Sequence, residues 1–219
     1  MDIEWKQPEE LEHLALSIIK KHQPQALITP KAIAILDLIE CAREKFGYTF
    51  EAAVLPILGG QKALGCVDNK NKKILLDVNL LSQAGNSNMW TFVAAHELGH
   101  LVLHRQYFEN DQTPYDSVEI ENEFPVNKRL EWQANRFASE LLLPRDMVKC
   151  IVNAESDKMG ITRNFGKIYI DGKDYNYRTL NDICSAVSST FVVTKKVAQI
   201  RLQELGLIID DREYHRIFH

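Results

Sequence analysis

The sequence His-Glu-Leu-Gly-His at residues 96–100 is the feature that most constrains how this chain can fold. Apolar residues flank it on both sides: Val93, Ala94 and Ala95 before it, and Leu101 and Val102 after it. This pattern predicts a buried or cleft-lining helix over about 89–104. Residues four apart project from one face of a helix, so the imidazoles of His96 and His100 can reach one metal ion. Uncoordinated polar groups would be costly in such a helix, and we therefore expect the pair to bind a metal.

Glu97 lies one residue beyond His96 and therefore off the axis of the two imidazoles. It cannot easily be a third ligand, but it can reach a water molecule at the metal. That position suits the general base of a hydrolytic reaction. Zinc fits two imidazoles at about 2.0–2.1 Å. Manganese and iron remain alternative metals for this site, since two histidines and a glutamate do not select zinc alone.

A catalytic zinc takes three protein ligands and keeps one position open for water. We expect Glu131 to be the third ligand, because it lies in another predicted helix, over about 127–142. The small side chains of Ala134 and Ala138 would let this helix approach the metal helix closely. Asn135 could accept the free ring N–H of one ligating histidine, which fixes the orientation of that ring.

Two further residues compete for the third position. His104 lies four residues beyond His100. Each four-residue step along a helix rotates the side chain by about 40° and moves it about 6 Å along the axis, which places His104 too far away to share one ion with both other histidines. We therefore expect His104 to be a core or rim histidine. Glu140 lies nine residues beyond Glu131 and would point to the opposite side of the helix, so it is a poor substitute.

The rest of the chain predicts an α+β fold, mostly helical, with a small antiparallel sheet packed on the helix that carries the motif. The spacing of apolar residues, together with residues that cap or break helices, predicts helices over about 9–22, 30–46, 89–104, 127–142, 178–188 and 194–205. Two strands, over about 63–67 and 73–78, flank the turn 68–71 and predict a hairpin, and a second small hairpin is predicted over 167–177.

Composition restricts the classes of function. The chain of 219 residues has a formal net charge of −4, which gives no electrostatic footprint for nucleic acid or an anionic membrane. Its four cysteines are far apart, which argues against a disulfide framework or a cysteine-rich zinc site. The N-terminus has no secretory pattern, and no apolar run is long enough to span a bilayer, so we expect a cytoplasmic protein.

Three patches of the chain resemble the ImmA/IrrE family of metallopeptidases. They are 92–101 around the motif, 131–144 (Glu-Trp-Gln-Ala-Asn-Arg-Phe-Ala-Ser-Glu-Leu-Leu-Leu-Pro), and the C-terminal segment 191–207. Many zinc peptidases share the first patch. The second makes the resemblance specific, because it implies a glutamate ligand in a helix that ends with Leu-Leu-x-Pro.

The resemblance implies a compact zincin-like fold, with His96, His100 and Glu131 as zinc ligands and Glu97 as base. We expect residues 1–150 to hold the N-terminal helices and the catalytic core. Residues 151–219 would form a C-terminal hairpin and helical segment packed on the same core. Family members often act as regulatory proteases that inactivate helix-turn-helix repressors, so the expected partner is a protein substrate of that kind.

The chain departs from the family in two places. Thr91-Phe92-Val93 stands where the family often has Arg-Phe-Thr, and the acidic segment 105–127 is an elaboration of this chain. That segment is either a solvated loop, the interpretation we favour, or a lid that favours a basic substrate. The sequence does not identify the group that stabilises the oxyanion. Four residues in the last third of the chain are candidates: Tyr169, Tyr175, Tyr177 and His215.

Two alternatives to proteolysis remain. The sequence pattern of residues 180–207 is similar to that of a helix-turn-helix, with Lys195, Lys196 and Arg201 on the second helix. Nearby acidic residues and the lack of a broad basic patch argue against direct nucleic-acid binding as the principal activity. The chain could also regulate a partner by contact alone, although an intact Glu97 argues against that interpretation.

Overall fold

A computed structural model of the chain describes residues 4–58, 61–82, 88–108, 125–162, 166–171 and 173–211. Its contacts divide the chain into two compact units. The first unit comprises the N-terminal residues up to His22 and then Ile33–Leu142. The second comprises Gln23–Ala32 and the residues from Leu143 onward. Whether 151–219 packs on the core of 1–150 stays a prediction.

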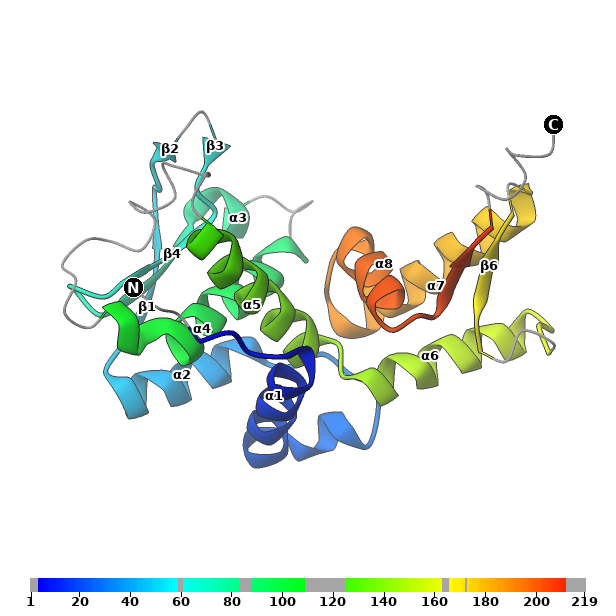
Figure 1. Ribbon diagram of the computed structural model, residues 1–219, viewed down its shortest axis with the longest axis horizontal. Coiled ribbons are helices and arrows are strands. Elements are labelled where there is room, and N and C mark those ends of the chain that lie inside the picture. The colour runs from blue at the N-terminus through cyan, green and yellow to red at the C-terminus, as the bar shows by residue number, and fades with distance from the viewer. Residues whose placement is uncertain are drawn as a thin grey trace. The chain divides into compact units, whose positions relative to one another are not determined.

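The first unit is built around two long helices that lie against each other. Its helices are α1 (Pro8–His22), α2 (Ile35–Phe46), α3 (Val78–Ser82), α4 (Met89–Phe108) and α5 (Pro125–Leu142). Helix α4 packs on α5, and α1 covers another side of α5 (Figure 1). Gly47, with φ of 76°, ends α2 in the left-handed conformation that glycine adopts without strain.

Helices α4 and α5 approach closely because small residues meet where they cross. A Cβ added at Gly99 would lie 3.3 Å from the backbone of Ala134 and 3.1 Å from Phe137. Ala134, Phe137 and Ala138 are fully buried in this contact layer. The predicted role of the small residues of the second helix, close helix packing, therefore agrees with the geometry.

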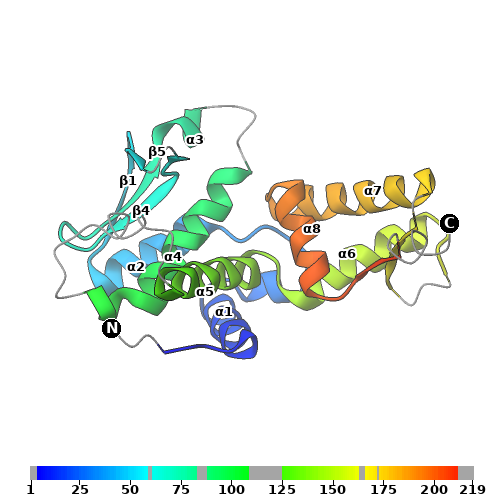
Figure 2. The same ribbon diagram turned by 45° about the horizontal axis from the view of Figure 1, so that its top comes forward.

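A three-stranded sheet of order β1-β5-β4 covers the other side of α4 (Figure 2). The strands are β1 (Thr49–Ala53), β4 (Gly65–Asp68) and β5 (Lys73–Asp77); a two-stranded ribbon, β2 (Ile57–Leu58) and β3 (Gln61–Lys62), lies in the sequence between β1 and β4. The predicted β4–β5 hairpin is confirmed. The prediction of a wholly antiparallel sheet is wrong, because β1 pairs with β5 in parallel.

The second unit is helical, with one short parallel pair of strands. Its elements are the 3-10 helix η1 (Pro24–Leu27), α6 (Arg145–Lys158), β6 (Ile168–Ile170), α7 (Asp174–Phe191), α8 (Lys195–Glu204) and β7 (Ile208–Asp210). The predicted hairpin over 167–177 is wrong: β6 pairs with the distant β7, and α7 already begins at Asp174. The predicted α+β class, mostly helical, is confirmed.

Arg201 of α8 anchors the second unit rather than facing outward. It is fully buried, and its Nε donates a hydrogen bond of 3.0 Å to the carbonyl oxygen of Leu143. Its Nη1 lies 3.3 Å from Glu204. One of the three basic residues counted toward a DNA-binding helix is therefore part of the core. In the part of the chain that the structure describes, no helix is long and apolar enough to cross a membrane.

Asp77, at the end of β5, ties the sheet to its neighbouring loops. The carboxylate is almost fully buried and accepts hydrogen bonds from the backbone of Leu55 and from Asn79, at 2.7–3.2 Å. Lys62 of the ribbon lies 3.0 Å away. Burial by itself raises the pKa of Asp77, but Lys62 and the hydrogen bonds outweigh it and lower the pKa to about 2.

We predict that Asp77→Asn lowers the free energy of unfolding by about 1–3 kcal/mol at neutral pH. The folded pKa lies below the unfolded value of 3.8, so the ionic part of this stabilisation is complete above pH 3.8 and is lost as pH falls toward 2. Urea unfolding of both proteins, repeated at several pH values from about 6 down to about 3, measures the free energy of unfolding. The difference in this free energy between wild type and variant should become smaller at the acid end. A difference that does not change with pH would contradict this interpretation.

Candidate metal centre

His96 and His100 of α4 and Glu131 of α5 bring three potential ligand atoms together. The Nε2 atoms of the two histidines are 2.9 Å apart. Glu131 Oε2 lies 3.2 Å from His96 Nε2, and Glu131 Oε1 lies 3.1 Å from His100 Nε2. Three residues from two different helices thus converge on one point, as a shared ion would require.

The donor set and its spacing fit zinc. Tetrahedral ligands at 2.0–2.1 Å from an ion stand about 3.3 Å from one another, close to the separations in this cluster. The side chain of His100 is 3% exposed, whereas those of His96 and Glu131 are 15% and 33% exposed. Solvent can therefore reach the cluster from the His96 and Glu131 side. A catalytic metal needs such access, because it keeps one position open.

The electrostatics of the cluster are those of a site made for a cation. Burial by itself raises the pKa of Glu131, but hydrogen bonds with His100 and His96 hold it well below its usual range. Burial by itself lowers the pKa of His96, but Glu131 and the charge of Glu97 raise it to about 9. Burial and the charge of His96 lower the pKa of His100. A bound metal ion must therefore displace the proton of His96 at neutral pH.

Each histidine of the pair has a hydrogen-bond partner on its other ring nitrogen. Asn135 Oδ1 lies 3.1 Å from His96 Nδ1, which is the contact expected from the sequence. His104 Nδ1 lies 3.1 Å from His100 Nδ1, and His104 is 1% exposed. His104 is thus a core histidine, as the helix geometry predicts, and it also orients a neighbouring ring. Glu140 is engaged elsewhere, in a buried ion pair with Arg136 at 2.7 Å.

Glu97 lies on the side of α4 that faces the sheet, next to Gly65 of β4. It is buried, with 6% exposure. A Cβ at position 65 would come within 2.8 Å of both Glu97 Cγ and Val93 Cγ1, and closer still to Glu97 Oε1. Only glycine therefore lets β4 lie this close to Glu97. The sequence carries no clear signal of this role, since a glycine at a strand end is ambiguous by itself.

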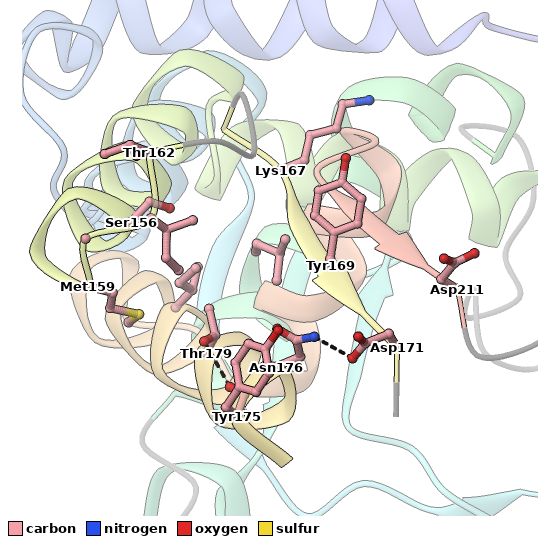
Figure 3. Close-up of a pocket in the computed structure, with 14 residues that line it drawn as sticks. Ser156, Met159, Thr162, Lys167, Tyr169, Asp171, Tyr175, Asn176, Thr179 and Asp211 are labelled. Carbon is pink, nitrogen blue, oxygen red and sulfur yellow. Dashed lines mark hydrogen bonds between the residues drawn. The ribbon is translucent and has the colours of Figure 1, made fainter. Parts of the chain in front are cut away.

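The tyrosines considered for the oxyanion belong to the second unit. Tyr169 and Tyr175 line a cavity of about 760 Å³ between α6, β6 and α7 (Figure 3). Tyr177 borders a smaller cavity beside α7 and α8. His215 lies outside the described residues. An oxyanion role for one of these side chains stays a hypothesis.

The acidic segment 105–127 is described only at its two ends. Helix α4 continues to Phe108, beyond its predicted end at 104, and α5 begins at Pro125. The acidic residues of the predicted loop lie outside the described residues: Glu109, Asp111, Asp116, Glu119, Glu121 and Glu123. The choice between a solvated loop and a lid is therefore untested.

Comparison with known proteins gives two matches. Residues 66–203, more than half of the chain, match the family model Peptidase_M78, described as the IrrE N-terminal-like domain. A stretch of 88 residues is 40% identical to the "Uncharacterized immunity region protein 2" of Bacillus phage phi105. That stretch covers 40% of this chain and 48% of the phage protein, so the chain spans about half the length of this relative.

We predict that the wild-type protein, reloaded with zinc and freed of excess ion, holds about one zinc per chain. Glu131→Ala should hold well under half of that amount, because it removes one of three ligands. Glu51→Ala, which removes an exposed carboxylate of β1, is the matched control and should bind zinc like the wild type. Elemental analysis at equal protein concentration measures this. Equal zinc in Glu131→Ala and the wild type would contradict the assignment.

Proposed function

This chain belongs to the M78 peptidase family through its IrrE N-terminal-like domain, and we propose that it is a zinc-dependent endopeptidase of regulatory function. The convergence of His96, His100 and Glu131 carries the proposal, because two imidazoles and a carboxylate form the ligand set of a catalytic zinc. The family by itself supports a peptidase that uses a metal. The identity of the metal and the roles of the individual residues are the proposal.

In this mechanism one group of residues holds the ion and another residue transfers a proton. His96, His100 and Glu131 hold zinc, and Asn135 keeps the His96 ring in its ligating orientation. When bound, zinc supplies Lewis acidity toward the scissile carbonyl and lowers the pKa of a water molecule to about 7. Glu97 accepts a proton from the attacking water and later donates it to the leaving amine.

Strand β4 offers a way to hold the substrate chain next to Glu97. It is an outer strand in the order β1-β5-β4, and its first residue, Gly65, lies beside Glu97. Among the described strands, β4 therefore has one side without a paired strand. An extended peptide could add to that edge through main-chain hydrogen bonds, which bind with little dependence on sequence.

The substrate we propose is a specific intracellular protein such as a helix-turn-helix repressor. The resemblance to regulatory proteases supports this choice, and the phage relative is described as an immunity region protein. The alternative is a regulator that keeps the metal site but acts on its partner by contact. The two differ in one respect: only the protease needs Glu97.

We predict that Glu97→Gln abolishes proteolysis while leaving the zinc content unchanged. Loss of a general base typically costs about 10²–10⁴-fold in rate. Labelling of new protein N-termini in cells that express wild type or Glu97→Gln, followed by mass spectrometry, should find substrate fragments only with the wild type. Glu131→Ala, which we expect to lose the metal, is the second inactive control. Regulation that survives Glu97→Gln would favour the contact mechanism.

We also predict that Gly65→Ala slows cleavage by about 10-fold or more, because a displaced base no longer meets the reacting atoms in the productive geometry. Zinc content should not change, since the heavy atoms nearest to a Cβ at position 65 belong to Glu97 and Val93 and not to one of the three ligands. Leu64→Ala, at a partly exposed neighbour, is the control and should cleave at nearly the wild-type rate. A Gly65→Ala protein with full activity would show that Glu97 tolerates displacement.

A further inference from the structure

The cavity of the second unit has the size and the lining of a ligand site. Its volume is about 760 Å³, and all the residues that line it belong to this unit (Figure 3). Pockets that bind small molecules typically measure about 300–1,000 Å³. Ile168 and Ile183, which line the cavity, are buried, whereas the rings of Tyr169 and Tyr175 are exposed. A ligand would therefore find both an apolar surface and two aromatic rings.

Strand β6 and the residues at its two ends line the cavity from one end to the other. Lys167 precedes the strand, Tyr169 lies at its centre and Asp171 follows it. Alternate residues of a strand project to the same side, so these three share one face. At about 3.3 Å per residue, Lys167 and Asp171 stand about 13 Å apart along the chain. Figure 3 shows Lys167 near one end of β6 and Asp171 near the other, with Tyr169 between them.

The two ends of the cavity carry opposite charges. Asp211 follows β7, and its backbone N–H donates a hydrogen bond of 2.7 Å to the last residue of β6, so it lies at the same end as Asp171. Asp171 is engaged, because it accepts a hydrogen bond from Asn176 and lies 3.3 Å from Lys173 Nζ. Among the described residues, the side chains of Lys167 and Asp211 have no ion-pair partner. One positive and one negative charge are thus available to a ligand.

These features select a class of ligand. A matching molecule carries an ammonium at one end, a carboxylate at the other and an apolar or aromatic group between them. One amino acid is too short, because an extended residue spans at most about 3.6 Å. Three extended residues span about 10 Å, which the flexible side chain of Lys167 can bridge to the ends of the cavity. A phosphate-bearing ligand fits poorly beside the two carboxylates, since like charges repel.

We propose that this cavity is a binding site for a short peptide of about three residues with free termini and an apolar or aromatic central side chain. The ammonium of the peptide contacts Asp211, and its carboxylate contacts Lys167. The central side chain packs against Tyr169 and Tyr175. This site is additional to the metal centre and does not depend on zinc.

The first test measures binding of the tripeptide Ala-Phe-Ala by isothermal titration calorimetry. The titrated protein is Glu97→Gln, which we do not expect to cut the peptide. We expect a single site per chain. The N-acetylated and the C-amidated peptide should each bind about 5-fold more weakly, because each lacks one of the two terminal charges and exposed ion pairs contribute on this scale.

The second test assigns each terminus of the peptide to its partner. Lys167→Gln should weaken binding of Ala-Phe-Ala about 5-fold and leave binding of the amidated peptide unchanged, since that peptide has no carboxylate to lose a partner. Asp211→Asn should show the same relation with the acetylated peptide. Tyr175→Ala, at a 61% exposed position, should reduce the preference for Ala-Phe-Ala over Ala-Ala-Ala. Lys196→Gln, at an exposed lysine of α8 that does not line this cavity, is the matched control and should change nothing.

The outcomes separate this inference from the proposed function. No binding of Ala-Phe-Ala at millimolar concentration, equal affinity for all three forms of the peptide, or unchanged binding in Lys167→Gln or Asp211→Asn would overturn the site. Loss of peptide binding in Glu131→Ala would place the peptide at the metal centre, which overturns this inference and supports the proposed function. Binding that survives Glu131→Ala and depends on the charges of Lys167 and Asp211 supports the site, whatever the zinc content of the protein.

Discussion

The close contact between α4 and α5 is the constraint on which the rest of the candidate site depends. Gly99 lies against the backbone of Ala134, and even a Cβ there would be in tight contact with Ala134 and Phe137, so that one of them would have to shift. The histidines come from one helix and the glutamate from the other, so their atoms meet within 2.9–3.2 Å only at this helix separation. Backbone packing thus sets the ligand geometry, and the flexible Glu131 side chain only completes it.

A buried polar cluster is stable only when each member has a partner, and the first unit provides the partners in successive layers. Glu131 opposes the charge on His96, Asn135 holds one imidazole, and His104 holds the other. Without these contacts, the burial of a carboxylate and three imidazoles would cost several kcal/mol, on the order of 2–7 for each neutral group left unpaired. The same layers orient the ligands, so stability and metal affinity depend on the same residues.

The convergence of the candidate ligands was predictable from sequence because its geometry follows from local spacing. His96 and His100 share a face by helix periodicity alone, and the distance to Glu131 required only that a second helix pack nearby. Pairing between distant segments was not predictable. Strand β1 is largely exposed and has no alternating pattern, and β6 pairs with β7 across two intervening helices. The role of Gly65 arises from such a distant contact, so no local pattern indicates it.

The most direct test of this account is the location of the metal itself. Anomalous diffraction from crystals of the zinc-loaded protein, collected above and below the zinc absorption edge, would give the position of the ion. The account predicts one strong peak at about 2.0–2.1 Å from Nε2 of His96, Nε2 of His100 and a carboxylate oxygen of Glu131. A zinc peak at another set of residues, or a peak at the histidines with Glu131 turned away, would contradict it.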